Sequence, residues 1–370
     1  MEHLLSAIVR GDETSWPWAD ADSEQEALFL DTACRHGIQA LVARQLRKAG
    51  VLDSWPPSIR AALARVAVQR ASVDQLLRQE VARVLAALAR AGIRPLLIKG
   101  TALAYTHYAH PCLRPRGDTD LLVRDAEVVM AMRVMEDLGY RRHNQVSGEL
   151  VTCQSAFIKG DRHRVQHVYD IHWKIADPQL FANLLSVDEL EPSAVGVPAL
   201  GEHARAIGDV HALLLACVHR VAHHNDSENL MWIYDIHLLA SSMDEEQLRR
   251  FARLAADRNV KAICARGLAL ADQWFHTGLS GNLVAELGGR SDRREPSETY
   301  LRSRLRKVDI LLSDLRALPE WRGRLKLLRE HLFPPATYML QSYAASSRAL
   351  LPALYTHRFV RGACRWFRPL

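Results

Sequence analysis

Two aspartates separated by one residue are the part of this sequence that most clearly suggests chemistry. Asp118 and Asp120 stand in RPRGDTDLLVRD, directly before the apolar residues Leu-Leu-Val. Side chains alternate between the two faces of a β-strand, so both carboxylates would point to one face. Two carboxylates on one face repel each other unless a cation lies between them. The spacing therefore predicts a cation site.

A third carboxylate follows about fifty residues later, in VYDIHW. Asp170 stands between apolar neighbours there, where a carboxylate is costly to bury unless it is paired or metal-bound. Three carboxylates on neighbouring strands can hold two Mg²⁺ ions, which prefer oxygen ligands and share their shell with substrate phosphates. Two such ions serve in-line displacement at phosphorus. His172 and Trp173, which end this motif, are expected to be core residues at the end of the strand.

A phosphate-binding turn is predicted upstream, at KGT, where a strand gives way to a helix. Gly100 allows close backbone approach, and the N–H of Thr101 would open the helix and face an anion. Lys99 would add a point charge. Arg114 and Arg116 precede the two aspartates and are placed to reach phosphate oxygens.

The elements that must position these residues can be predicted from hydrophobic periodicity. A strand at 93–100, a helix at 101–109, a strand at 118–123, a helix at 124–140 and two strands within 151–173, joined by a turn at KGDR, follow in that order. In the second helix, Asp125 is expected to be the N-cap and Gly139 the C-terminal stop. The order β-α-β-α-β-β predicts a small α/β unit with a mixed sheet.

The rest of the chain is predicted to be helical. Gly50 and Gly92 are expected helix stops, and WPP at 55–57 separates two helical stretches. The predicted fold class is α+β, a small mixed β-sheet core flanked by N-terminal and C-terminal helical regions. The predicted regions are an N-terminal helical region at 1–91, the α/β core at 92–195, a helical substrate-side domain at 196–290 and a basic helical C-terminal region at 291–370, with a linker or exposed loop at 288–298.

Together, LLIKGTALAY, LRPRGDTDLLV and VYDIHW resemble the DNA polymerase β-like nucleotidyltransferase superfamily. More narrowly, they resemble an uncharacterised bacterial nucleotidyltransferase family that shares a K-G, an R-x-x-x-D-x-D and a D-x-H-W element. The resemblance covers about residues 90–240. It implies that Asp118, Asp120 and Asp170 are catalytic metal ligands and that Gly100 and Thr101 contact the nucleotide phosphates.

The resemblance also implies a Mg²⁺-dependent enzyme that transfers an NMP from an NTP, such as ATP, to an acceptor hydroxyl and releases pyrophosphate. The acceptor could be a small molecule, a peptide, a saccharide or an RNA. The resemblance further implies that the enzyme is an accessory to a polysaccharide or natural-product pathway. Two alternatives remain open at this point. One is a non-catalytic binding module on a degenerate nucleotidyltransferase fold, and the other is a toxin-like enzyme that modifies tRNA or protein.

Histidines recur in one predicted helical stretch, at positions 211, 219, 223, 224 and 237. His219 and His223 are four residues apart and share a helical face, so with Asp235 and His237 they could hold a transition metal. They could equally line a substrate cleft or pack between helices. The family resemblance includes a His-rich helix followed by W-x-x-D, here Trp232 to Asp235, which favours a role shared with the nucleotidyl site.

The bulk composition excludes several classes of protein. The chain has 370 residues, 48% hydrophobic and 24% charged, which is typical of soluble globular proteins. No apolar run approaches the eighteen or more residues of a membrane span, and the start, MEHLLSAIVRGDE, lacks a signal-peptide pattern. Six scattered cysteines without C-x-x-C predict reduced thiols in a cytoplasm.

The positive charge is concentrated near the C-terminal end. Residues 290–370 contain 17 Lys/Arg and 7 Asp/Glu, a balance of +10, so the remainder carries −4 of the total of +6. Such a region could face phosphates or an anionic surface, or it could form Arg-rich helices with solvated faces. Pro352 and Gly362 are expected to interrupt a helix in RALLPALYTHRFVRGACRWFRPL, so we expect this segment to dock back onto the protein rather than lie on a membrane.

Overall fold

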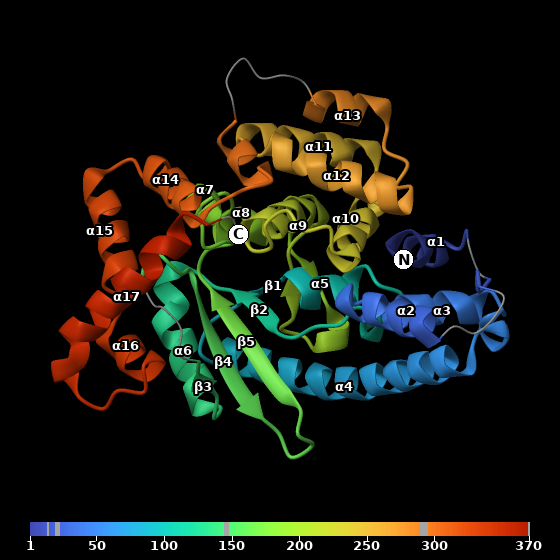
Figure 1. Cartoon of the computed structure of the whole chain (residues 1–370), viewed down its shortest axis with the longest axis horizontal. Coiled ribbons are helices and arrows are strands. Elements are labelled where there is room, and N and C mark those ends of the chain that lie inside the picture. Colours follow the sequence, from blue (N-terminus) through green and yellow to red (C-terminus); the bar gives the residue numbers. More distant parts are fainter. Residues whose placement is uncertain (13–14, 19–22, 144–147, 289–294, 369–370) are drawn as a thin grey trace.

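The computed structural model describes residues 1–12, 15–18, 23–143, 148–288 and 295–368. Within these residues, seven strands form one sheet in the order β3-β4-β5-β2-β1-β7-β6, and helices surround it (Figure 1). The strands are β1 Leu96–Ile98, β2 Thr119–Leu122, β3 Arg141–Arg142, β4 Gln154–Gly160, β5 Gln166–His172, β6 Val195–Gly196 and β7 Arg205–Ala206. The predicted α+β class, a small mixed sheet with helical flanks, is confirmed.

The sheet is mixed because β2 and β5 run parallel while β1–β2 and β4–β5 are antiparallel. The sequence predicted these four strands. It missed β3, β6 and β7, because a strand of two residues has no periodicity to detect. Through β7, which pairs in parallel with β1, the sheet extends to Ala206. The division of the chain into four regions stays a prediction.

One face of the sheet is covered by two helices, α4 (Pro57–Arg90) and α6 (Val128–Asp137). Their buried side chains form one core with alternate strand residues, among them Leu97, Leu121 and Ile171. In Figure 1, α4 runs along the underside of the sheet. Long apolar strand residues at every second position therefore anchor this face.

The opposite face carries the polar residues of interest. Leu96, Ile98 and Leu122 belong to a second, larger core together with buried residues of α9 (Asp209–Ala222), α10 (Leu230–Ser242) and α12 (Lys261–Phe275). Because strand side chains alternate, Asp120 shares this face with Leu122. The site thus lies between the sheet and the helices that follow it in sequence.

The flanking regions are helical, as predicted. The remaining helices before the sheet are α1 Glu2–Arg10, α2 Ser23–Arg35 and α3 Gln39–Lys48, and those after it are α11 Glu245–Asp257 and α13 Gly281–Gly288. Gly50 and Gly92 follow helices with φ of +71° and +79°, a left-handed backbone that glycine adopts at little cost. Both predicted stops are confirmed.

Shorter elements connect the sheet to its surroundings. The helices are α5 Lys99–Thr106, α7 Gln179–Ala182 and α8 Val187–Leu190, and 3₁₀ turns lie at Leu52–Ser54, Pro111–Leu113, Asp125–Glu127, Glu191–Ser193, Pro198–Leu200, Pro296–Leu301 and Arg348–Leu350. The prediction of Asp125 as an N-cap was wrong. Its carboxylate accepts from Lys174 Nζ at 2.9 Å, and Glu127 instead accepts from the Arg124 backbone N–H at 3.0 Å. Gly139 ends α6 with φ +83°, as predicted.

The C-terminal helices lie together at one side of the molecule (Figure 1). They are α14 Lys307–Ala317, α15 Trp321–Leu332, α16 Ala336–Ser342 and α17 Leu351–Trp366. Of the predicted linker, residues 289–294 lie outside the described residues. The expected interruption of the last helix was wrong, since Pro352 stands in the first turn, where proline is tolerated, and α17 continues through Gly362.

One carboxylate of α15 ties these helices to the sheet. Glu330 accepts hydrogen bonds from the backbone N–H groups of Glu149, Leu150 and Val151, at 3.1, 2.9 and 3.1 Å. These three residues lead into β4. The start of β4 is therefore fixed by a residue of the C-terminal helices.

Within the described part of the chain, the helices that are long enough to cross a membrane are not sufficiently apolar to do so. The five cysteines whose side chains are described are free thiols.

Candidate active site

The register of the sheet places two predicted carboxylates side by side. Asp120 of β2 stands directly opposite Asp170 of β5, and Leu122 stands opposite His172. Side chains at paired positions of adjacent strands project from the same face and lie close enough to interact. Asp118 precedes β2 by one residue. The parallel pairing of β2 and β5 thus brings Asp170 to the Asp-x-Asp motif.

A cavity of about 520 Å³ opens over these carboxylates, bounded by the sheet, α5, α9 and α10. The predicted site residues that line it are Lys99, Gly100, Arg114, Asp118, Asp120 and Asp170. This volume is of the size that small-molecule ligands occupy in proteins. Six of the eight predicted residues therefore meet at one cavity.

Lys99 contacts the central carboxylate of the site. Its Nζ donates to Asp120 Oδ1 at 2.8 Å, and His172 Nε2 lies 2.8 Å from the same oxygen. Asp120 is only 3% exposed. Burial by itself would raise the pKa of Asp120, but the Lys99 ammonium and the His172 contact hold that pKa well below its usual range. Asp120 is therefore a fixed anion.

The backbone of Lys99 is strained. Its φ of +55° lies in the left-handed region, which costs a residue with a Cβ about 1 to 2 kcal/mol. The residue makes the turn from β1 into α5, and its side chain is anchored on Asp120. Such strain persists where the surrounding structure fixes it, and it occurs often at functional sites.

The two neighbouring carboxyl groups have shifted pKa values. Burial, and next the charge of Asp120, raise the pKa of Asp118 to about 6. Burial, Asp120 and Asp118 raise the pKa of Asp170 to about 7. Gln154 of β4 donates to Asp170 Oδ2 at 2.9 Å. The mutual repulsion predicted from the Asp-x-Asp spacing is thus present, and an added cation would relieve it.

Three side chains of the site can serve as ligands of one metal ion. Asp120, Asp170 and His172 each offer a ligand atom, and these atoms lie within 4.8 Å of one another. Two carboxylates and an imidazole are a donor set that divalent cations accept. His172 is 1% exposed at the end of β5, as expected of a core residue, but its place beside the two carboxylates was missed. Its D-x-H spacing from Asp170 could have found it, because positions two apart on a strand share a face.

Arg114 reaches the cavity through an ion pair that the sequence did not predict. Its Nη2 and Nε donate to the two oxygens of Asp235 in α10, at 2.7 and 3.2 Å, and Tyr108 donates to the same carboxylate at 2.7 Å. A Cβ on Gly100 would lie 2.8 Å from Arg114 Nη1. Gly100 therefore lets the guanidinium lie against the start of α5, beside the turn predicted to bind phosphate.

The other two predicted residues are placed differently. Thr101 is 1% exposed, and its hydroxyl donates to the Asp118 backbone carbonyl at 3.2 Å, so it ties α5 to the start of β2. Arg116 pairs with Asp74 of α4, and its guanidinium lies 5.0 Å from the centre of the Tyr105 ring. Neither side chain lines the cavity. A phosphate contact by Thr101 would use its backbone N–H.

The histidine-rich stretch lines the same cavity. His219, His223 and His224 contribute to its wall, and the His224 ring stacks on Trp232 with ring centroids 3.7 Å apart. Burial, and next the charge of Lys99, lower the pKa of His224 to about 4. The described histidines of this stretch do not form a metal cluster of their own. The interpretation as cleft lining fits this placement.

A mixed sheet that gathers carboxylates, a lysine and an arginine at one cavity is the arrangement of a nucleotidyltransferase domain. The chain belongs to a family of uncharacterised nucleotidyltransferases, whose model matches residues 22–276. No curated protein matches it. The suspected family is therefore confirmed, and the match includes the sheet and the cavity but not α13 to α17. Membership supports a transferase that acts on an NTP and uses a metal.

Proposed function

We propose that this protein is a Mg²⁺-dependent enzyme that transfers an NMP from an NTP to an acceptor hydroxyl. The acceptor oxygen forms a bond to the α-phosphorus, the bond from that phosphorus to the bridging oxygen breaks, and pyrophosphate leaves. One observation carries this proposal. Asp120 lies in a cavity with Asp170 on the adjacent strand, Lys99 on its carboxylate and the N-terminus of α5 beside it.

The acidic residues divide into two groups. Asp120 and Asp170, with His172, would hold a metal ion, and Asp118 at the same cavity would complete the shell of a second. When bound, such ions neutralise the triphosphate and lower the barrier to attack at phosphorus. The Asp118 role rests on its place beside the cavity and on the family resemblance.

The triphosphate would lie on the basic side of the cavity. Lys99 would move its ammonium from Asp120 to a phosphate oxygen, and Arg114 is held nearby by Asp235. The absence of a side chain at Gly100 lets the Arg114 guanidinium lie against the start of α5, whose first N–H groups would supply further donors for an anion. Arg116 has no part in this proposal because Asp74 holds it outside the cavity.

The acceptor hydroxyl would approach Asp170. One carboxylate oxygen of Asp170 is fixed by Gln154, so the group keeps its orientation while it takes the hydroxyl proton. The imidazoles and Trp232 on the opposite wall would contact the acceptor or the base. A small molecule, a peptide, a saccharide and an RNA all remain candidate acceptors.

Calorimetry with Mg²⁺ and each of the four NTPs tests the proposal. Wild type should bind at least one NTP, and Asp118→Asn/Asp120→Asn should lose at least about tenfold in affinity, which equals 1.4 kcal/mol. Asp53→Asn/Asp257→Asn removes the same charge at exposed positions and should bind like wild type. Equal or absent binding in wild type and the site variant would contradict the metal site.

Transfer itself needs a second assay, with an α-labelled NTP and candidate acceptors. Label on an acceptor, lost in Asp118→Asn, would establish an enzyme. NTP binding with no transfer to any acceptor would favour a non-catalytic module. Growth inhibition on expression that disappears with Asp118→Asn would favour a toxin-like enzyme.

A further inference from the structure

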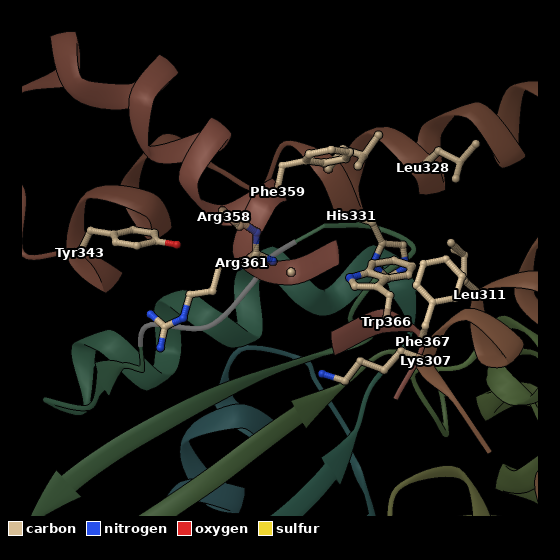
Figure 2. Close-up of a pocket in the computed structure, with 12 residues that line it drawn as sticks. Lys307, Leu311, Leu328, His331, Tyr343, Arg358, Phe359, Arg361, Trp366 and Phe367 are labelled. Carbon is tan, nitrogen blue, oxygen red and sulfur yellow. The ribbon is translucent and has the colours of Figure 1, made fainter. Parts of the chain in front are cut away.

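A second cavity, of about 500 Å³, lies among the C-terminal helices, outside the part of the chain that the family matches (Figure 2). Most of its wall is apolar, formed by Leu311 of α14, Leu328 and Leu332 of α15, Phe359 and Trp366 of α17, and Phe367. His331 contributes a ring whose centroid is 5.5 Å from that of Trp366. The nucleotidyltransferase site contributes nothing to this cavity.

Three cationic side chains also line this cavity: Lys307, Arg358 and Arg361. Figure 2 shows the charged ends of Lys307 and Arg361 directed away from the apolar group formed by Trp366, Phe367 and Leu311. Among the described residues that line the cavity, none is acidic. The described lining of the cavity therefore combines an apolar wall with positive charge.

The surface around the cavity is unusually apolar for an exposed region. Phe359, Val360 and Phe367 are 64%, 67% and 64% exposed. Val360 lies on α17, and Phe367 directly follows the last residue of this helix, Trp366. Of the 14 large hydrophobic side chains exposed among the described residues, nine lie between residues 312 and 367. Exposed apolar side chains concentrated in one region are a feature of interaction sites.

The charge of this region favours an anionic partner. Residues 290–370 carry +10, whereas the rest of the chain carries −4. A second copy of the chain docked on the same surface would bring like charges together. Basic side chains beside exposed Phe and Val are the features of helices that lie in the interface of an anionic bilayer.

We propose that the C-terminal helices α14 to α17 dock on an anionic lipid bilayer. Phe359, Val360 and Phe367 enter the interface, and Arg358 and Arg361 bind lipid phosphates. The cavity takes the apolar part of one such lipid, with Lys307 at its charged end. The continuity of α17 through Gly362 permits this arrangement, which an interrupted helix would not.

Co-sedimentation of the full chain with extruded vesicles tests this proposal. Vesicles of phosphatidylcholine mixed with phosphatidylglycerol should bind the protein, pure phosphatidylcholine should not, and added salt should weaken binding. Arg358→Glu/Arg361→Glu should weaken binding at least about tenfold, because each basic residue near the surface contributes about 1 kcal/mol. Phe359→Ser/Phe367→Ser should weaken it while leaving the charge unchanged.

The matched control is Arg302→Glu/Arg304→Glu, two exposed arginines of the same region that do not line the cavity. It should lose much less binding than the cavity pair, and thermal melts should show every variant folded. Three results would overturn the proposal: no binding to anionic vesicles, equal binding to neutral ones, or equal losses in the two arginine pairs. Sensitivity of RNA binding or of self-association to the cavity pair, without vesicle binding, would also overturn it. Co-sedimentation measures vesicle binding and not nucleotide binding, so its result is independent of the proposed activity.

Discussion

Lys99 and Asp120 form a buried ion pair between the end of β1 and the middle of β2, with Nζ and Oδ1 2.8 Å apart. Their side chains are 12% and 5% exposed. Asp120 is also one of the three residues that could hold a metal ion. If the proposed function is correct, Lys99 competes with the metal in the absence of nucleotide and binds phosphate in its presence.

Lys99→Met should separate these two roles. Without the ammonium, the Asp120 carboxylate loses its cationic partner and keeps only the His172 contact, so Mg²⁺ or Mn²⁺ alone should bind more tightly, by about tenfold or 1.4 kcal/mol, while the affinity for NTP should fall. Calorimetry with the metal alone and with the NTP measures both. Lys174→Met, which removes an outlying ion pair with Asp125, should change neither affinity. Weaker metal binding in Lys99→Met would contradict competition.

Gly100→Ala should disturb Arg114. The added Cβ would lie 2.8 Å from Arg114 Nη1, so the guanidinium must move away from the start of α5. NTP affinity should fall at least about tenfold, as expected when a charge-assisted contact to phosphate is lost. Gly160→Ala is the control, since a Cβ at Gly160 meets no atom within 4 Å. Unchanged NTP binding in Gly100→Ala would exclude Arg114 from the phosphate site.

Asp235→Ala should destabilise the fold. It would leave the Arg114 guanidinium buried without its carboxylate, at a cost of about 3 to 5 kcal/mol. Tyr108→Phe removes one hydrogen bond to the same carboxylate and should cost about 1.5 to 3 kcal/mol. Denaturant unfolding measures both.

The control for Asp235→Ala is an exposed pair. Asp31 and Arg35 contact each other at 2.9 Å, with side chains 65% and 56% exposed, and Asp31→Ala should cost less than about 1 kcal/mol. Similar losses of unfolding free energy at the two sites would show that the buried Arg114–Asp235 pair stabilises the fold no more than an exposed pair does.

Asp314 of α14 should make stability depend on pH. It is 6% exposed and accepts from the Gln179 backbone N–H at 2.7 Å, and burial raises its pKa to about 7. Between about pH 4, where an unfolded aspartate ionises, and pH 7, the folded state holds the proton and the unfolded state does not. The stabilisation from this group is therefore full below about pH 4 and falls as pH rises to about 7.

Denaturant unfolding of wild type and Asp314→Asn across this range checks the sign. The free energy of unfolding of wild type, relative to the variant, should fall by about 2 to 4 kcal/mol between pH 4 and pH 8. Parallel curves for the two proteins would contradict a raised pKa at Asp314.

The order of elements around the site could be predicted because it rests on local pattern. Alternation in DTDLLV and VYDIHW, and helical spacing between them, placed Asp120 and Asp170 on strands of one α/β unit, whereas the pairing of β2 with β5 is a tertiary contact. The partners of these residues could not be predicted. Gln154 meets Asp170 only through the register of β4 on β5, and Asp235 meets Arg114 across 121 residues of chain. Both contacts depend on tertiary packing.

The placement of the Arg116 side chain could not be predicted from the sequence either. Its position two residues before Asp118 suggested a phosphate ligand, but sequence spacing does not fix the direction of a loop side chain. Asp74, 42 residues earlier on α4, pairs with Arg116 and holds it outside the cavity. The sequence predicts α4 only as a helix. Its Asp74 holds Arg116, so that Arg114 lines the cavity and Arg116 does not.

The contact of Glu330 with the residues that lead into β4 connects the C-terminal helices to the candidate site through that strand. At its start it is held by the C-terminal helices, and at Gln154, three residues beyond Val151, it orients Asp170. A change in how α15 is seated therefore reaches the site through one short stretch of backbone. The C-terminal helices, although the family match does not include them, support the sheet that carries the candidate site and cannot be treated as a detachable appendage.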